Sequence, residues 1–361
     1  MIKKNSKWKA PTIGAKQINL LEKLSNTCAV SGNEDAVRKI VLDHVKLLAD
    51  DLTVDALGNV LVTKKGSGSN LPKVMLAAHM DEVGFMIAEE DGDGLYRFVI
   101  VGGIDERQLA GKPVWVGKDN LPGVIGAKAI HLTTASEKKN SIEVSALRID
   151  IGPSNKNKLS HGDWGTFATN FSRIGPSLRG KALDDRVGVA TLITLLENAP
   201  KNIDLLAAFT VQEEVGLRGA RVAAYTMNPD MAIALDCTPS MNMPMWDGTE
   251  NTLYRSKLDQ GPAIYVADGS TLADPRLVNL LMSVGDAYKI PYQVRQPGGG
   301  GTDAGSIHKQ RSGIPSVSVS VPGRYLHTAA SIIRLDDWKN SVALLHAALC
   351  HIDKSILRIA R

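Results

Sequence analysis

Four short, unbroken apolar segments, each separated by stretches with helical spacing, constrain the fold of this chain more than any other feature. The segments are VMLAAHM (74–80), IDLLAAFTV (203–211), MAIALD (231–236) and IPSVSVSVP (314–322). Apolar residues recur at helical spacing in residues 15–26, 34–51, 188–199 and 336–352, with polar residues on the opposite face. Apolar runs of strand length without polar alternation are typical of strands buried on both faces. The pattern therefore predicts an α/β fold with a mixed sheet sandwiched by helices.

The middle of the chain has a different pattern. From 84 to 170 the sequence holds short β-like segments broken by Gly, Pro, Asp and Asn, and no convincing helix. This composition predicts a small β-barrel or sandwich. We therefore expect residues 1–83 and 171–361 to form one discontinuous α/β domain, with residues 84–170 inserted into it.

Charge and cysteine content limit the classes of partner. The 42 Lys and Arg residues against 38 Asp and Glu give a net charge of +4, and outside the N-terminal MIKKNSKWK there is no dense basic block. Nucleic acid is therefore not expected as a partner. No segment approaches the roughly 18 apolar residues that span a bilayer, so no membrane association is expected. The three cysteines share no metal-type spacing, and a reducing, cytoplasmic location fits them best.

Acidic and imidazole side chains follow the predicted strands at the point where each strand ends. The carboxyl ends of strands in an open α/β sheet meet at one edge, where the ligand crevice lies. We therefore expect these side chains to converge there: His79, Asp81 and Glu82 at the end of the first segment, Glu213 and Glu214 after the second, Asp236 in the third and His327 after the fourth.

The residue types at this edge indicate a metal site. Carboxylates and imidazoles without thiolates suit zinc, cobalt or manganese, and an excess of carboxylates can bridge two ions. Two divalent cations would hold a bridging water, lower its pKa and clamp a carbonyl oxygen. They would also offset the cost of placing the adjacent acids Glu213 and Glu214 at the exit of a buried strand.

Two further segments have alternative interpretations. Asp184 and Asp185 precede a helix, where an Asp pair is commonly an N-cap, but together with the other acids they favour a metal site. The segment PGGGGTDAG (297–305) has the glycine content of a phosphate-binding loop. It lacks the Lys and Ser/Thr of the P-loop pattern and the spacing of a dinucleotide fingerprint.

Six motifs in this order carry a resemblance to a known family. They are AAHMDEVGFMI, GKALDDRVGV, FTVQEEVGLRGA, ALDCT, GGGGTDAG and RYLHT. The chain resembles, from about residue 18 to residue 350, the cytoplasmic dinuclear metallo-aminopeptidases that include the glutamyl and deblocking aminopeptidases and form tetrahedral dodecamers. The resemblance implies a zinc-peptidase-like catalytic domain, and a PDZ-like β-barrel insert that is used in assembly.

The resemblance also implies a role for each residue that matches a motif. His79 and Asp236 would bind one metal ion, Glu214 and His327 the other, and Asp184 would bridge the two. Glu213 would be the general base, and Asp81 would orient the imidazole of His79. A cis peptide bond is expected between Asp184 and Asp185. The glycine-rich segment would line the substrate path through Gly300, Gly301, Thr302 and Asp303.

These expectations define a function and its rivals. The predicted protein is a metal-dependent aminopeptidase with two divalent ions per subunit, zinc or cobalt first and manganese as a further option. It would assemble into a large homo-oligomer, a dodecamer by resemblance, that encloses the sites and so admits short peptides. The alternatives are an endoglucanase-like glycoside hydrolase, which also uses paired carboxylates, and a non-catalytic assembly protein. The S1 preference, whether acidic, apolar or broad, stays open.

Overall fold

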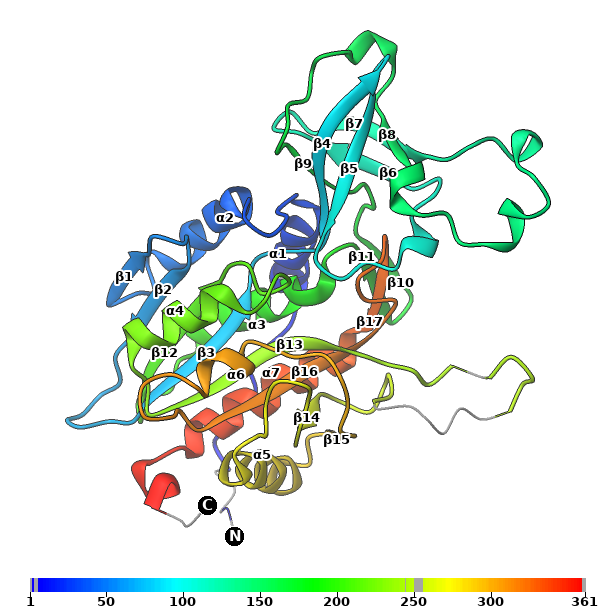
Figure 1. Cartoon of the computed structure of the whole chain (residues 1–361). Helices are drawn as coiled ribbons and strands as arrows, with labels where there is room; N and C mark the ends of the chain where they lie inside the picture. The colour runs from blue at the N-terminus through cyan, green and yellow to red at the C-terminus, as the bar shows by residue number, and fades with distance from the viewer. Residues whose placement is uncertain (1, 3–5, 244, 250–255, 359–361) are drawn as a thin grey trace.

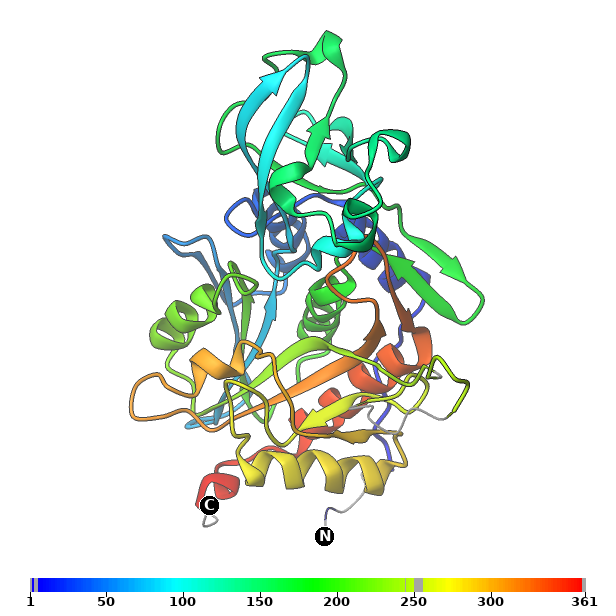
Figure 2. The ribbon, with the colours of Figure 1, turned by 45° about the vertical axis from the view of Figure 1, so that its right-hand side comes forward.

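The chain folds into a large body and a smaller barrel that projects from one end of it (Figure 1). This computed structural model describes residue 2 and residues 6–243, 245–249 and 256–358. The two ends of the chain lie close together at the end of the body opposite the barrel, and a second view shows the same arrangement (Figure 2).

A mixed sheet forms the centre of the body. Its strands are β1 (Asp51–Val54), β2 (Val60–Lys64), β3 (Lys73–His79), β10 (Ser172–Ile174), β11 (Ser177–Gly180), β12 (Asp204–Thr210), β13 (Met231–Pro239), β14 (Ala263–Tyr265), β15 (Gln293–Arg295), β16 (Ser316–Arg324) and β17 (Ser331–Arg334). Within the described residues the order is β1-β2-β12-β3-β13-β16-β17-β11-β10, with β14 beside β16 and β15 beside β14. The four central strands β12, β3, β13 and β16 are parallel to one another. They are the four apolar segments of the sequence, and their carboxyl ends meet at one edge.

Helices cover both faces of this sheet, as the unbroken apolar strands predict. In β3, Val74 and Leu76 belong to the core on one face, and Met75 and Ala77 belong to the core on the other. The first core includes α1 (Ala15–Asn26), α2 (Asp35–Val45), α3 (Leu183–Glu197), α5 (Pro275–Tyr288) and α7 (Leu335–His351). The second includes α4 (Arg218–Met227) and α6 (Ala304–Ile307). The predicted α/β class and the layered arrangement are confirmed.

Six antiparallel strands close into the barrel, in the order β4-β5-β8-β7-β6-β9. Aromatic side chains fill its separate core, with the ring of Phe85 edge-on to Phe98 at 5.3 Å and to Phe167 at 5.1 Å between centroids. The helix-poor stretch is thus a closed barrel and not a sandwich. Its strands are β4 (Gly84–Gly92), β5 (Leu95–Val101), β6 (Pro113–Val116), β7 (Leu121–Gly126), β8 (Arg148–Asp150) and β9 (Trp164–Phe167). Short 3-10 turns η1 (Glu106–Gln108), η2 (Ile130–Leu132), η3 (Glu137–Lys139), η4 (Val144–Ala146) and η5 (Pro153–Asn155) join them, and η6 (Lys354–Arg358) follows α7.

One predicted helix is too long. The helical spacing of residues 34–51 was expected to continue to the end of that stretch, but α2 ends at Val45 and β1 begins at Asp51. A turn at residues 46–48 follows the helix, and β1 then pairs antiparallel with β2. Leu47, which extends the apolar spacing in the sequence, is 90% exposed in the turn. Backbone pairing at the sheet edge thus prevails over the local helical pattern.

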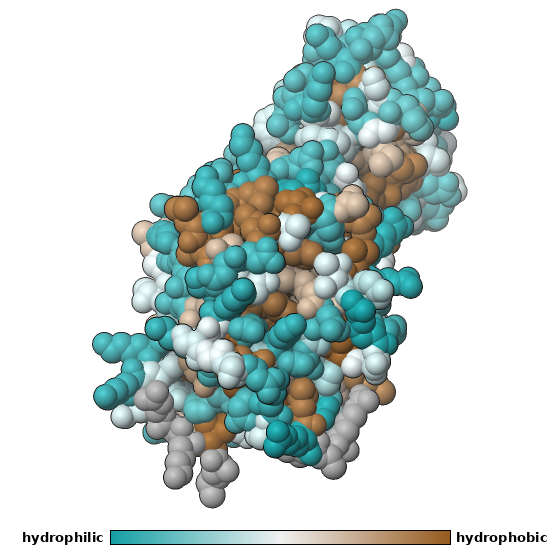
Figure 3. Space-filling view, turned by 90° about the vertical axis from the view of Figure 1, so that its left-hand side faces the viewer, coloured by the Kyte–Doolittle hydropathy of each residue, from teal (hydrophilic) through white to brown (hydrophobic). Residues whose placement is uncertain are grey.

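The body also exposes apolar side chains at this edge. Besides Leu47, Val54 and Leu57 in β1 and the following turn are exposed. The face on the left of Figure 1 shows hydrophobic surface gathered on the upper part of the body, at the height of α2 and β1 (Figure 3). A surface of this kind is typical of a contact with another protein chain.

The cysteines Cys28, Cys237 and Cys350 are all free. Among the described helices, none is both long and apolar enough to cross a bilayer.

Candidate metal centre and active-site cavity

The carboxyl edge of the central strands borders a cavity of about 790 Å³. His79 ends β3, Glu213 and Glu214 follow β12, and Asp236 lies in β13, as the sequence indicates. Asp184 lies at the start of α3 and His327 follows β16. Five of these predicted residues line the cavity: Asp184, Glu213, Glu214, Asp236 and His327. The other two of the predicted catalytic and metal set, His79 and Asp81, are buried behind it.

Asp184 lies between the two imidazoles. Its Oδ1 is 3.2 Å from Nε2 of His79, and its Oδ2 is 3.4 Å from Nε2 of His327. The same nitrogen of His327 is 3.3 Å from Oε2 of Glu214. The peptide bond between Asp184 and Asp185 is cis, as expected. A single carboxylate thus presents one oxygen to each half of the site.

The remaining ring nitrogens fix the orientation of both imidazoles. Nδ1 of His79 lies 3.2 Å from the carbonyl oxygen of Asp81, and Nδ1 of His327 lies 2.9 Å from that of Gly103. Because a carbonyl oxygen only accepts, each Nδ1 donates and each Nε2 faces the carboxylates. This is the arrangement that metal-binding histidines usually have, with the second nitrogen donating to a carbonyl or a carboxylate.

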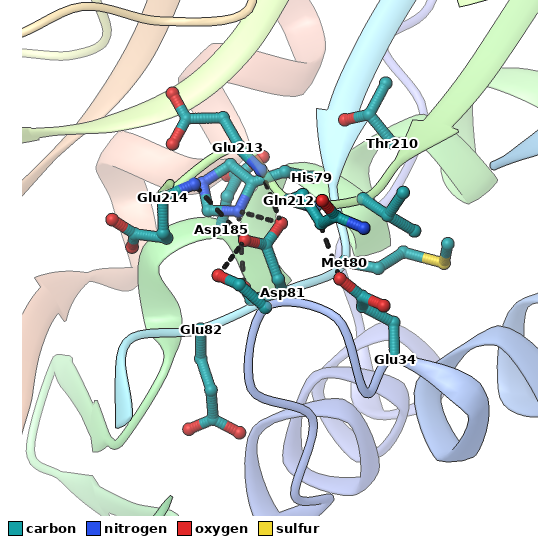
Figure 4. Close-up of polar contacts among 12 residues, drawn as sticks. Glu34, His79, Met80, Asp81, Glu82, Asp185, Thr210, Gln212, Glu213 and Glu214 are labelled. Carbon is teal, nitrogen blue, oxygen red and sulfur yellow. Dashed lines mark hydrogen bonds and ion pairs between the residues drawn. The ribbon is translucent and has the colours of Figure 1, made fainter. Parts of the chain in front are cut away.

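The turn after β12 holds Glu213 and Glu214 through their backbone. The N–H groups of Glu213 and Glu214 donate to Oδ1 and Oδ2 of Asp81 at 3.0 and 3.2 Å. The hydroxyl of Ser31 donates to the same carboxylate at 2.6 Å. Asp81 is fully buried, and Figure 4 shows it beneath the two glutamates. One buried carboxylate therefore sets the direction of both glutamates.

Sequence analysis did not identify two further residues that hold this turn. The carboxylate of Glu34 accepts a hydrogen bond from the N–H of Gln212 at 3.2 Å, and Oδ1 of Asn59 accepts one from Val211 at 3.0 Å. Glu34 and Asn59 are buried. Four consecutive N–H groups, from Val211 to Glu214, thus donate to buried side-chain oxygens. Neither Glu34 nor Asn59 follows a central strand, so the search for strand ends could not find them.

Burial and the neighbouring carboxylates shift the pKa values of the titratable groups in the site. Burial opposes a charge on the imidazole of His327, but Asp184 and Glu214 prevail and raise its pKa to about 11. Burial likewise opposes a charge on His79, whose bonds to Asp184 and Asp81 raise its pKa well above the usual value. Burial raises the pKa of Asp236 well above its ordinary range, and the charges of Asp184 and Asp185 raise it further. In the absence of cations, bound protons offset the negative charge of these clustered carboxylates.

Divalent cations fit these residues. His79, Asp184 and Glu214 each offer a ligand atom within 4.8 Å of the others. Two buried carboxylate oxygens near the site, Oδ2 of Asp185 and Oδ1 of Asp303, have no hydrogen-bond partner. Buried carboxylates in this number are stabilised by cations, and their oxygen and imidazole donors suit zinc, cobalt or manganese.

Glu82, which follows the His79 motif, faces away from the cavity residues into a buried ion cluster. Its carboxylate accepts from Nζ of Lys181 at 2.7 and 2.8 Å and from a guanidinium nitrogen of Arg186 at 3.2 Å. All three side chains are buried. Arg186 also donates to the carbonyl of Met80, next to His79. Glu82 therefore braces the strand end rather than facing substrate.

The glycine-rich segment divides between the cavity and the interior. Gly300 and Gly301 line the cavity. Thr302 and Asp303 are buried, with Oγ1 of Thr302 2.7 Å from Oγ of Ser318 and Oδ2 of Asp303 accepting from Thr210 at 2.5 Å. Burial raises the pKa of Asp303 to about 6. These two side chains anchor the segment to β16 and β12.

The lining of the cavity also includes Tyr265 and Arg295, which the sequence analysis did not select. They lie on the short strands β14 and β15, where they are directly paired. Neither belongs to a motif, and short strands of three residues carry no clear signal in the sequence.

Comparison with protein families and sequences gives a consistent result. A family model described as M42 glutamyl aminopeptidase matches residues 58–344. The chain is 32% identical to the lysyl aminopeptidase of Pyrococcus furiosus, over 91% of this chain and 96% of that protein. It is 31% identical to the glutamyl aminopeptidase of Lactococcus lactis, over 91% of this chain and 95% of that protein.

Comparison with solved structures gives the same result as comparison with sequences. The aminopeptidase of the archaeon Desulfurococcus kamchatkensis matches with a TM-score of 0.89 and 34% identity, covering 95% of this chain and 97% of that one. The TET1 peptidase of Pyrococcus horikoshii, described as assembling into a tetrahedron or a large octahedral shell, matches with 0.81 and 32%, covering 93% and 100%. A Thermotoga maritima protein named as an endoglucanase matches with 0.74 and 31%, covering 91% and 95%.

Proposed function

The chain belongs to the M42 glutamyl aminopeptidase family and is an aminopeptidase, and from that starting point we propose that two divalent metal ions support its removal of N-terminal residues from short peptides. The observation that carries the proposal is the position of Asp184, which presents one carboxylate oxygen to Nε2 of each imidazole. A carboxylate so placed suits a bridge between two ions.

In this proposal each ion has its own ligands. His79 and Asp236 would hold one ion, Glu214 and His327 would hold the other, and Asp184 would contribute to both. When bound, such a pair of ions lowers the pKa of a water molecule and polarises the scissile carbonyl. The Nδ1 bonds to the carbonyls of Asp81 and Gly103 keep each imidazole in the tautomer that binds a cation.

Glu213 is the proposed general base. It lines the cavity, and burial raises the pKa of its carboxyl well above the usual value. A general base works best when its pKa approaches the working pH. Glu213 takes a proton from the attacking water and passes it to the departing amine. Asp81 positions Glu213 by accepting the hydrogen bond of its N–H.

The substrate path follows the glycine-rich segment. Gly300 and Gly301 line the cavity and have no side chain, so a peptide backbone can approach them. The φ angle of Gly300 is +80°, a conformation that favours glycine. Thr302 and Asp303 support this segment from the interior through hydrogen bonds with Ser318 and Thr210.

The proposal includes a homo-oligomer, a dodecamer by analogy with the related tetrahedral assemblies. Its support is the assembly described for the Pyrococcus horikoshii peptidase together with the exposed apolar side chains of this chain. Trp246 is 95% exposed on the segment after β13, and Leu47 is similarly exposed after α2. We assign the inserted residues 84–170 a part in that assembly, as a PDZ-like domain. Native mass spectrometry tests the proposed homo-oligomer, and a protein that is monomeric at micromolar concentration contradicts it.

A chelation and replacement assay tests the function itself. The protein is stripped of metal, then assayed with aminoacyl p-nitroanilides after addition of zinc, cobalt or manganese, with cellulose as the comparison substrate. We expect anilide hydrolysis that requires metal. Cleavage of cellulose that is insensitive to chelator supports the glycoside hydrolase alternative, and the Thermotoga maritima relative makes that arm necessary. Metal binding without either activity supports the non-catalytic assembly protein.

A further inference from the structure

One basic side chain lines the cavity together with four acids. Among the described lining residues, Asp184, Glu213, Glu214 and Asp236 are acidic, and Arg295 is the one Lys or Arg. Arg295 ends the short strand β15 and is paired with Tyr265 of β14. The lining of the cavity therefore combines a group of acids with a single cationic side chain.

Arg295 is 3% exposed, and its partners carry no charge. In the described part of the chain its guanidinium donates to the hydroxyl of Thr238 at 3.0 Å and to the carbonyls of Gly299 and Ala267 at 3.2 and 3.5 Å. Its carbon Cζ lies 4.2 Å from the centre of the Tyr265 ring. A guanidinium stays protonated in proteins, so a buried positive charge faces the cavity without a paired carboxylate.

These contacts also orient the guanidinium. Three acceptors and a stacked ring fix its plane, so little side-chain freedom is lost when a ligand binds. A guanidinium has five N–H donors in a fork that matches a carboxylate. Metal ions held by the acids of the cavity would neutralise those acids, and Arg295 would remain a cation without a paired carboxylate.

We propose that Arg295 is a specificity-determining residue that binds a carboxylate of the substrate, a proposal that rests on the aminopeptidase function above. The carboxylate has two possible sources, an acidic side chain on the N-terminal residue or the C-terminal carboxylate of a very short peptide. The relatives include both a lysyl and a glutamyl aminopeptidase, so membership of the family does not decide the preference.

Two substrate pairs test the proposal with the unaltered protein. Glutamyl and glutaminyl p-nitroanilide have the same shape and differ in charge. A dipeptide and its C-terminal amide differ only at the other carboxylate. We expect kcat/KM to favour the charged member of one pair by about 10- to 100-fold, the scale of one charge-assisted hydrogen bond. The pair that responds identifies the source of the carboxylate.

Two variants separate charge recognition from a structural role. Arg295→Met removes the charge, and Thr238→Val removes one brace of the guanidinium while keeping its charge. We expect Arg295→Met to abolish the preference, measured as the ratio of kcat/KM between the charged and the neutral member of the pair that responds. Thr238→Val should preserve the preference. Metal content and thermal unfolding of each variant check that the site is intact.

The outcomes are distinguishable. Equal kcat/KM within both pairs for the unaltered protein overturns the role of Arg295, even if Arg295→Met does not fold. A uniform loss for charged and neutral substrates in Arg295→Met also overturns it and leaves Arg295 as a brace. No hydrolysis of any aminoacyl substrate, with or without metal, instead overturns the proposed function.

Discussion

The backbone N–H of Glu213 donates a hydrogen bond to Oδ1 of Asp81 at 3.0 Å. The proposed base is therefore positioned by a carboxylate that also contacts the imidazole of His79, with Nδ1 3.5 Å from the same oxygen. Asp81→Asn places an amide where two N–H groups and an imidazole require acceptors. We expect metal affinity or kcat to fall about 10- to 100-fold.

Ser31→Ala is the matched control for Asp81→Asn. It removes one hydrogen bond from the same carboxylate and keeps the charge. We expect a smaller loss of activity, measured as kcat at saturating metal. An equal loss for both variants would mean that the hydrogen bonds to the backbone of the turn carry no special weight.

The two adjacent glutamates should respond differently to loss of charge. Glu213→Gln should retain both metal ions and lose kcat by about 100- to 10,000-fold, the usual contribution of a general base. Glu214→Gln should lose one ion per subunit, because its Oε2 faces Nε2 of His327. Metal analysis by mass spectrometry beside steady-state kinetics separates the two effects. Equal metal loss in both variants contradicts separate roles.

Glu34 offers a test of positioning from outside the cavity. Its carboxylate accepts hydrogen bonds from the N–H groups of Gly32 at 2.7 Å and Gln212 at 3.2 Å. Glu34→Ala removes the acceptor of both hydrogen bonds, and we expect the free energy of unfolding to fall by about 1–3 kcal/mol, the sum of two ordinary hydrogen bonds. Glu34→Gln keeps one acceptor oxygen and should retain more stability and more activity. Urea unfolding and kcat of both variants test this, and an Ala variant as stable as the native protein contradicts it.

Metal binding should release protons. In the metal-free protein burial opposes the charge of His327, yet Asp184 and Glu214 raise its pKa to about 11, so the imidazole is protonated at neutral pH. The raised pKa of Asp236 acts in the same direction. Protons then compete with the cation, and apparent metal affinity rises with pH up to the region of that pKa. Calorimetric titration in two buffers of different ionisation enthalpy measures the release, and identical heats contradict it.

The buried cluster of Glu82, Lys181 and Arg186 should contribute strongly to stability. Glu82→Gln leaves two buried cations without a carboxylate, and we expect a loss of about 3–5 kcal/mol in the free energy of unfolding. Glu197→Gln is the control, because it breaks an ion pair with Lys16, whose side chain is 69% exposed. That change should cost about 1 kcal/mol or less. Equal effects would show that the buried cluster is already compensated by other groups.

The parts of the site that follow central strands could be predicted from the sequence, because the register of a parallel sheet brings strand ends together. His79, Glu213 and Asp236 lie at that edge for this reason. The contact of Glu34 with Gln212 joins positions 178 residues apart and depends on how α2 packs against α3 and β2, which no local pattern encodes. Arg295 was missed for a related reason, since it acquires its place in the cavity only when β15 pairs with β14.

The fold likewise has parts that could be predicted from the sequence and parts that could not. The alternation of β3 and β12 between two cores follows directly from their apolar runs, so the layered body could be predicted. The end of α2 could not, because pairing of β1 with β2 competes there with helical spacing. Within the glycine-rich segment, Thr302 and Asp303 are buried, whereas Gly300 and Gly301 line the cavity. This difference depends on the tertiary contacts of Thr302 with Ser318 and of Asp303 with Thr210, which no local pattern encodes.

The hydrogen bond between Nδ1 of His327 and the carbonyl of Gly103 crosses from the body to the loop after β5 of the barrel. A Cβ added at Gly103 would lie 3.4 Å from that nitrogen, so the loop approaches the imidazole closely. The barrel therefore contributes directly to the orientation of His327. An engineered chain from which the barrel is excised loses the acceptor that sets the tautomer of His327, and any movement that shifts the barrel in an assembled particle reaches a proposed metal ligand through one carbonyl group.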